Sequence, residues 1–132
     1  MNKSQFGMIG LGTMGRNLVL NIADHGFAVC GYDRDEAQQQ RLVSEAAGKL
    51  VSVAASLQEL VNKLEKPARI MLLVPAGKIV DAVLSDLVPL LQKDDIVIDG
   101  GNSHFTDTDR RYTQLQSSGI HFMGMGDRKS VV

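Results

Sequence analysis

The chain has 132 residues, of which 44% are hydrophobic and 22% are charged, as is typical of one globular domain that buries a core. Its 14 Lys and Arg residues nearly balance its 15 Asp and Glu residues, so we expect neither nucleic acid nor an anionic membrane as a partner, because both select basic surfaces. No apolar run reaches the ~20 residues of a membrane span, and no room for a signal peptide precedes the first strand. Cys30 is the only cysteine and cannot form an internal disulfide. We therefore expect a cytoplasmic protein.

Strand and helix patterns alternate along the whole chain. Apolar runs predict strands at residues 5–9, 28–32, 50–53, 69–74, 96–98 and 120–123. Predicted helices lie between them: one from Met14 to Gly26 with Met14 on its buried face, then residues 35–46, 56–64, a segment after Gly77 that Pro89 interrupts, and residues 107–116. This alternation predicts an α/β, Rossmann-type doubly wound fold: a mostly parallel six-stranded sheet with helices on both faces. Ligands of such sheets lie across the carboxyl ends of the strands.

A glycine-rich segment stands between the first predicted strand and the first predicted helix. In that context a G-x-G-x-x-G sequence is a phosphate-binding turn. Gly10 allows the tight turn, Gly12 lets the backbone approach a pyrophosphate, and Gly15 lets the helix pack closely on the strand. The helix N-terminus adds free N–H groups and the positive end of its dipole. The residues predicted to bind a dinucleotide here are Gly10, Leu11, Gly12, Thr13, Met14 and Gly15.

The residues after the second strand, Asp33-Arg34-Asp35, are where a dinucleotide fold binds the adenosine ribose. Asp33 has the usual spacing of ~20 residues from the glycines and indicates NAD, because a carboxylate repels a 2′-phosphate. Arg34 indicates NADP, because a guanidinium suits a phosphate and stacks on adenine. The alternative is a solvated turn in which Asp35 caps the next helix. The residues by themselves leave this choice open.

Two further segments follow predicted strands. Val74, Pro75 and Ala76 either approach a nicotinamide ribose or form a plain strand-to-helix turn. After the fifth strand, two glycines permit a sharp turn that presents Asn102 and Ser103 where nicotinamide and substrate would meet.

Other polar residues suggest little chemistry. The three histidines and Cys30 have no metal-ligand spacing, so we expect no metal site, and Cys30 is expected to be a buried, inert thiol. The pair Arg110-Arg111 is expected to be solvated.

The chain resembles the 6-phosphogluconate dehydrogenase family, one of the β-hydroxyacid dehydrogenases, from about residue 6 to residue 126. The matching motifs are Gly10-Leu11-Gly12-Thr13-Met14-Gly15-Arg16-Asn17-Leu18, then Asn21 and His25-Gly26-Phe27, and above all Ile96-Val97-Ile98-Asp99-Gly100-Gly101-Asn102-Ser103 followed by Asp107-Thr108 and Arg110-Arg111.

The resemblance implies an oxidoreductase of the pentose phosphate pathway that oxidises 6-phosphogluconate with NADP and decarboxylates the product to ribulose 5-phosphate. It places the pyrophosphate at residues 10–15, the adenosine end at residues 33–35 with Arg34 foremost, and the nicotinamide half at residues 74–76. It also implies that Asn102 contacts cofactor and substrate, that Ser103 contacts substrate, and that the full-length enzyme is a homodimer.

Three positions depart from the family pattern. Asp33-Arg34-Asp35 replaces Asn-Arg-Ser or Asn-Arg-Thr and adds negative charge, so NAD is an alternative to NADP; Pro75 replaces a lysine; and residues 127–132 replace a Val-Ser-Gly-Gly substrate loop. The family's lysine base, glutamate acid and helical dimer-forming domain would follow residue 132. We therefore expect a dinucleotide-binding domain at residues 1–126, an atypical tail at 127–132, no catalytic residue, and cofactor binding without turnover. We expect 6-phosphogluconate to bind only with the helical domain present.

Three other functions compete with this one. A methyltransferase also has a glycine turn after its first strand, although Arg34 and the Gly-Gly-Asn-Ser segment argue against it. The other two are a fragment of an NAD-preferring β-hydroxyacid dehydrogenase and a non-catalytic dinucleotide-sensing module.

Overall fold

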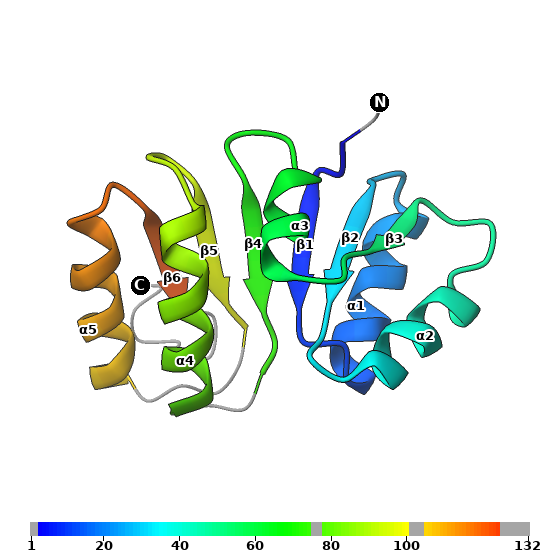
Figure 1. Cartoon of the computed structure of the whole chain (residues 1–132), viewed down its shortest axis with the longest axis horizontal. Coiled ribbons are helices and arrows are strands. Elements are labelled where there is room, and N and C mark those ends of the chain that lie inside the picture. Colours follow the sequence, from blue (N-terminus) through cyan, green and yellow to red (C-terminus); the bar gives the residue numbers. More distant parts are fainter. Residues whose placement is uncertain (1–2, 75–77, 101–104, 125–132) are drawn as a thin grey trace.

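Six parallel strands form a single sheet in the order β3-β2-β1-β4-β5-β6 (Figure 1). The computed structural model describes residues 3–74, 78–100 and 105–124. The strands are β1 Phe6–Ile9, β2 Val29–Tyr32, β3 Val51–Val53, β4 Arg69–Leu72, β5 Ile96–Asp99 and β6 His121–Gly124. The helices are α1 Thr13–Asp24, α2 Glu36–Glu45, α3 Leu57–Asn62, α4 Lys78–Leu87 and α5 Phe105–Gln116. The predicted fold class is confirmed.

The strand order reverses at β1, which lies between β2 and β4. Met8 of β1 is in register with Gly31 on one side and with Met71 on the other. The chain therefore runs outward through β2 and β3, returns to β4 beside β1, and continues outward through β5 and β6. This reversal is the topological switch point of a Rossmann sheet, where ligands bind beyond the carboxyl ends of the strands.

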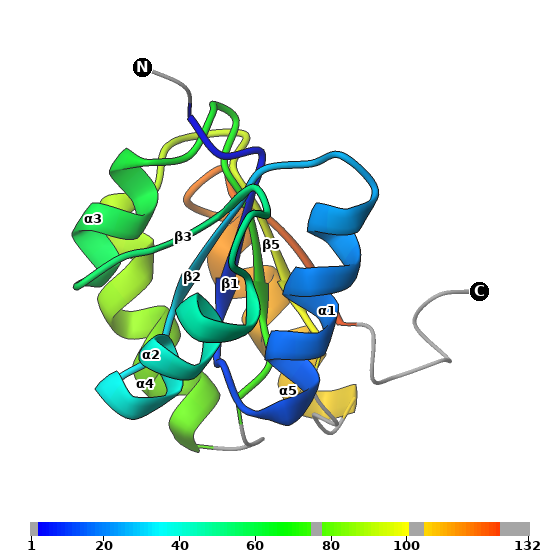
Figure 2. The same ribbon diagram turned by 90° about the vertical axis from the view of Figure 1, so that its right-hand side faces the viewer.

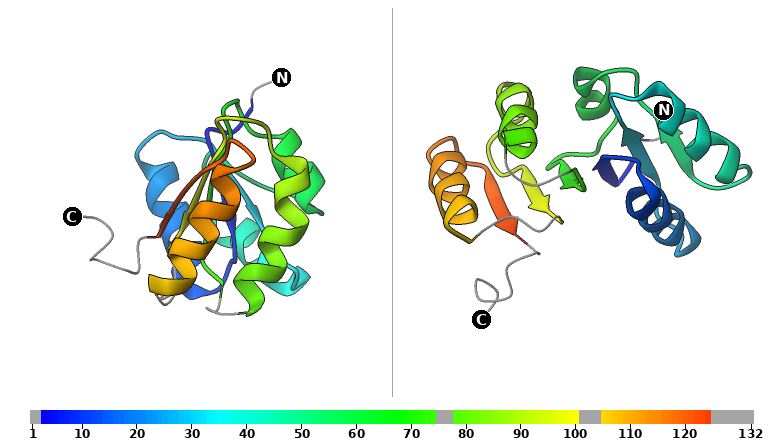
Figure 3. Two further views of the ribbon diagram at one scale, coloured as in Figure 1. Left: turned by 90° about the vertical axis from the view of Figure 1, so that its left-hand side faces the viewer. Right: turned by 90° about the horizontal axis from the view of Figure 1, so that it is seen from below.

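Helices cover both faces of the sheet and enclose two hydrophobic clusters. Figure 2 shows α1 on one side of the sheet and α3 and α4 on the other. Figure 3 shows α5 beside β6. The larger cluster includes Leu60 of α3, Leu84 of α4 and Leu115 of α5, and the smaller one includes Val19 of α1 and Leu42 of α2. Among the described residues, the structure has no helix whose length and apolar character would let it cross a membrane.

Local sequence signals explain where several helices begin and end. The Ser56 hydroxyl accepts a hydrogen bond from the Glu59 N–H and caps α3. The α4 helix ends at Leu87, and Val88–Leu90 forms a 3₁₀ turn, because Pro89 lacks the N–H that would continue the helix. One expectation is wrong: Met14 is 73% exposed, because α1 begins beyond the edge of the sheet and buries Gly15, Arg16, Val19 and Ala23 instead.

The expectation that Arg110 and Arg111 are both solvated is also wrong. Successive residues point about 100° apart around a helix, so Arg111 faces inward and is fully buried whereas Arg110 is about half exposed. The Arg111 Nε donates to Asp81 on α4 at 2.9 Å, and its Nη1 lies 3.7 Å from the buried Asp99 carboxylate at the end of β5. Arg111 therefore joins α5 to α4 and to β5.

The substitution Arg111→Leu should lower the free energy of unfolding by about 3–5 kcal/mol, because the buried Asp99 carboxylate loses its guanidinium partner. Arg110→Leu removes an exposed ion pair with the same Asp81 and should cost about 0–1 kcal/mol. Urea denaturation of the two variants measures both quantities. Similar costs for the two variants would contradict a structural role for the buried arginine.

Candidate functional site

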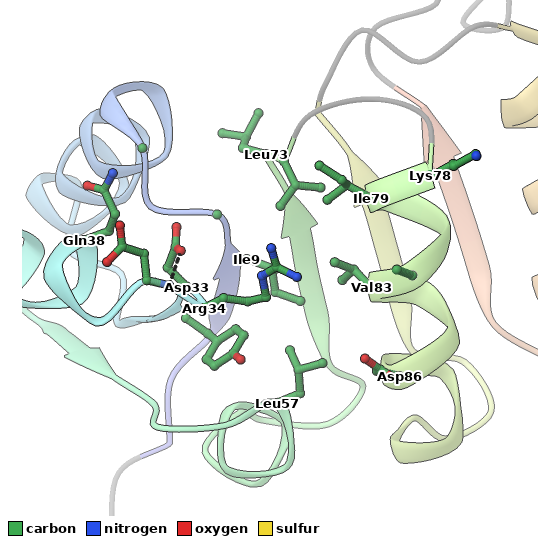
Figure 4. Close-up of a pocket in the computed structure, with 16 residues that line it drawn as sticks. Ile9, Asp33, Arg34, Gln38, Leu57, Leu73, Lys78, Ile79, Val83 and Asp86 are labelled. Carbon is green, nitrogen blue, oxygen red and sulfur yellow. Dashed lines mark hydrogen bonds between the residues drawn. The ribbon is translucent and has the colours of Figure 1, made fainter.

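A cleft of about 640 Å³ lies at the switch point, between the glycine turn and α4 (Figure 4). Its size is that of a pocket for a small organic ligand. The predicted binding residues that line it are Gly10, Gly12, Asp33, Arg34, Asp35 and Val74. The opposite wall comes from α4, through Lys78, Ile79, Ala82, Val83 and Asp86. The structure thus brings residues from three predicted segments together at one place.

The glycines of the turn have different packing environments. Gly10 has a φ of +100°, and a Cβ there would overlap with the Leu73 carbonyl. A Cβ on Gly15 would overlap with the carbonyl oxygen of Gly10, so α1 can approach the turn only because residue 15 has no side chain. A Cβ on Gly12 would meet nothing within 4 Å. The backbone at Gly12 therefore faces open space in the cleft.

The start of α1 offers polar groups to that space. Gly12 is the N-cap residue of α1, and no side chain caps the helix there. The first backbone N–H groups of a helix lack intrahelical acceptors and lie at the positive end of its dipole, an arrangement that suits an anion. Thr13 and Met14 are exposed but are not among the residues that line the cleft, whereas the side chain of Leu11 is fully buried in the core.

Both carboxylate oxygens of Asp33 accept hydrogen bonds from the backbone. Oδ2 accepts from the Leu11 N–H at 2.7 Å, and Oδ1 accepts from the Asp35 N–H at 2.8 Å. The Asp35 carboxylate in turn accepts from the Ala37 N–H at 3.0 Å, and so caps α2 as the alternative interpretation of this turn predicted. Asp33 thereby links the turn after β1 to the turn after β2.

The side chain of Arg34 is exposed and extends into the cleft toward the α4 wall, whereas Lys78 points away from it (Figure 4). The surface opposite Arg34 includes the apolar side chains of Ile79, Ala82 and Val83, and Leu57 lies below them. A flat heteroaromatic ring can pack against the apolar wall. The guanidinium opposite can stack on that ring or bind an anionic group attached to it.

Sequence reasoning missed Arg16 as part of this region. Its side chain is 11% exposed, and its Nη1 donates to the Leu11 carbonyl at 3.0 Å and to Gln38 Oε1 at 2.7 Å. Arg16 belongs to the motif that resembles the family, but nothing in that motif indicates that its side chain is buried, because an arginine in the first turn of a helix is normally solvated. Only the fold places α2 above it.

Four predicted site residues, Pro75, Ala76, Asn102 and Ser103, lie outside the described residues. The residues that flank them are placed at the same edge of the sheet. Val74 lines the cleft, and the Gly100 N–H donates to the Leu72 carbonyl at 2.8 Å, which fixes the end of β5 beside β4.

The described residues contain no group of three or more His, Cys, Asp and Glu side chains that could hold a metal ion. Cys30 is fully buried in β2, and burial raises the pKa of its thiol. Burial and the raised pKa both favour the protonated thiol, as expected of a structural cysteine.

Residues 5–126 match the family described as the NAD binding domain of 6-phosphogluconate dehydrogenase. Similar proteins include decarboxylating 6-phosphogluconate dehydrogenase 1 of Saccharomyces cerevisiae, 52% identical over 93% of this chain. The NADP(+)-dependent decarboxylating 6-phosphogluconate dehydrogenase of Bacillus subtilis is 48% identical over 96% of this chain. The chain spans 25% and 27% of the lengths of these two relatives.

A solved structure of the Plasmodium falciparum 6-phosphogluconate dehydrogenase also matches this fold. Its TM-score is 0.86 at 34% sequence identity, and the match covers 91% of this chain and 27% of the other. The Plasmodium enzyme is described in its apo form, in complex with its cofactor NADP+ and in complex with its substrate 6-phosphogluconate.

The substitution Gly15→Ala should lower the free energy of unfolding by about 1–3 kcal/mol, because the new methyl group forces α1 away from the Gly10 carbonyl. Gly12→Ala is the matched control, since residue 12 has open space and a φ of −65°, and should change stability by less than about 0.5 kcal/mol. Thermal or urea unfolding of both variants checks this. Equal losses would show that the close packing of α1 on the turn does not depend on Gly15.

Asp81 of α4, which pairs with Arg110 and Arg111 of α5, should make the stability of the protein depend on pH in the acid range. The hydrogen bond from Arg111 is the main cause that lowers the pKa of Asp81. Burial of the carboxylate raises this pKa, and the hydrogen bond from Arg110 lowers it further. A carboxyl whose pKa is lowered by folding stabilises the native state above its unfolded pKa of about 4 and loses that contribution as pH falls through the folded value. The stability difference between wild type and Asp81→Asn should therefore be constant above about pH 5 and shrink below about pH 4. Urea unfolding at several pH values measures it, and a difference that stays constant to about pH 2 would contradict it.

Proposed function

The chain belongs to the NAD-binding domain family of 6-phosphogluconate dehydrogenase, and from this we propose that its cleft binds NADP(H) as the cofactor site of a decarboxylating 6-phosphogluconate dehydrogenase. The proposal rests on one observation: Gly12, which faces open space, the uncapped N-terminus of α1 and Arg34 all lie in one cleft at the switch point. These are the groups needed for a pyrophosphate and for a second phosphate on the adenosine ribose.

The proposed cofactor position follows from the shape and charge of the cleft. The pyrophosphate would lie over Gly12 and the first N–H groups of α1, where no Cβ blocks its approach. The adenine would lie against Ile79 and Val83 of α4, and Arg34 would bind the 2′-phosphate. Val74, Pro75, Ala76 and Asn102 are proposed to lie along the nicotinamide half, and Asn102 and Ser103 to contact substrate.

The choice of NADP over NAD is supported by the different states of Asp33 and Arg34. Both Asp33 oxygens already accept backbone N–H groups, which offset part of the carboxylate charge and hold it within the turn. Arg34 by contrast extends into the cleft. The NADP(+)-dependence of the Bacillus subtilis relative agrees with this choice.

The proposed reaction of the whole protein is the oxidation and decarboxylation of 6-phosphogluconate. NADP+ held in this cleft would supply the acceptor for the hydride removed from the alcohol carbon of the substrate. The part proposed for this chain is to bind the dinucleotide, to orient it at the carboxyl edge of the sheet, and to present Asn102 and Ser103 beside it. We assign no acid or base to these 132 residues and expect no turnover by this chain alone.

Fluorescence titration of reduced cofactors tests the proposal. The wild type should bind NADPH more tightly than NADH, and rising salt should weaken NADPH binding more because a 2′-phosphate carries extra charge. Arg34→Gln should weaken NADPH binding by about 10–100-fold, the loss expected for a charged hydrogen bond, and change NADH binding little. Arg41→Gln, at an exposed arginine on α2, is the control and should change neither.

Other outcomes have definite meanings. Tighter binding of NADH would assign the site to NAD, with Asp33 as the dominant residue. Gly12→Ala, which leaves the fold unstrained, should weaken both cofactors, because its methyl group occupies the proposed pyrophosphate position. Binding of neither cofactor by the wild type would refute the proposed function.

A further inference from the structure

Arg16 is a buried cation in the first turn of α1. Its residue is 9% exposed, although arginine is rarely buried unless it is paired. A guanidinium removed from water must have acceptors for its N–H groups, and their positions indicate what the residue holds in place.

Those acceptors lie on two different elements. Arg16 Nη1 donates to the Leu11 carbonyl in the glycine turn at 3.0 Å and to Gln38 Oε1 on α2 at 2.7 Å. Its Nε donates to Glu45, farther along α2, at 3.2 Å. The Glu45 side chain is 46% exposed, so this ion pair is screened by water and is weak. The bonds of Nη1 are therefore the main link between the glycine turn and α2.

Leu11 is held on both sides. Its N–H donates to Asp33 Oδ2, its carbonyl accepts from Arg16, and its side chain is fully buried. The peptide groups before and after Leu11 are thereby fixed immediately ahead of Gly12. Asp33 and Arg16 join the glycine turn to the β2–α2 segment at two separate points.

These links set the spacing of the two anion-binding parts of the cleft. In one dinucleotide, the phosphate that contacts Gly12 and the ribose phosphate that contacts Arg34 are covalently connected, so the distance between them is limited. If both turns are held at the right separation before binding, the free energy of binding is not reduced by the entropy cost of ordering them. We propose that Arg16 is a positioning residue that fixes the glycine turn relative to α2, so that one ligand contacts both anion-binding turns at once.

This inference rests on the proposed function, and its test compares ligands that contact one turn or both. NADPH and adenosine 2′,5′-bisphosphate carry phosphates for both turns, whereas adenosine 2′-monophosphate carries one only for the Arg34 turn. Arg16→Met should weaken binding of the first two about tenfold, the scale of one charged hydrogen bond, and change the third less than about twofold. Arg41→Met, an exposed arginine on α2, is the matched control and should change none of the three.

Arg16→Lys keeps the charge and provides a second variant if Arg16→Met does not fold, which circular dichroism would reveal. Lysine has one nitrogen and no planar fork, so it should reproduce the selective loss for the two-phosphate ligands with a smaller magnitude. Binding of each ligand is measured by calorimetric titration, with NMR shifts for the weak monophosphate.

The pattern across ligands decides the outcome, since a purely structural role would not distinguish between them. Equal weakening of all three ligands, or unchanged NADPH binding in a folded variant, would overturn the positioning role while leaving the proposed function intact. Failure of the wild-type chain to bind NADPH and the bisphosphate would overturn the proposed function itself and the positioning role with it.

Discussion

The start of α1 packs directly on the turn that ends β1, with the carbonyl oxygen of Gly10 where a Cβ of residue 15 would stand. Most features of the cleft depend on this contact. It places the α1 N-terminus beyond the carboxyl end of the central strand, and it leaves Gly12 facing open space. It also sets Arg16, one residue later, where its side chain can turn back to the Leu11 carbonyl. A side chain at residue 15 would move all three.

The two walls of the cleft are each held by a buried or nearly buried arginine. Arg16 ties the glycine turn to α2, and Arg111 ties α4 to α5 and to the end of β5. Such cations require acceptors in defined positions, because a charge without partners is costly inside a protein. Arg16 therefore constrains the glycine turn and α2, and Arg111 constrains α4, α5 and the end of β5.

Several parts of the site follow from local sequence signals. The spacing of Gly10, Gly12 and Gly15 after an apolar run is sufficient to predict the turn, since each glycine meets a requirement that arises within a few residues. The capping roles of Asp35 and Ser56 are local for the same reason. Other features could not be predicted in this way. Whether Asp33 is available to a ribose depends on Leu11, 22 positions earlier in the chain, whose N–H it accepts.

The sequence by itself determined the class of fold, the strands and helices, the glycine turn after β1, and the family resemblance, because periodicity and short motifs reflect requirements of neighbouring residues. Only the tertiary structure decided which charged residues are buried. Adjacent arginines 110 and 111 are alike in sequence, yet one faces water and the other lies between Asp81 and Asp99, on α4 and at the end of β5. Arg16 likewise has its main partners on α2 and in the glycine turn. Whether a charged side chain is buried depends on contacts between elements that are far apart in the sequence. A local sequence pattern therefore cannot predict it.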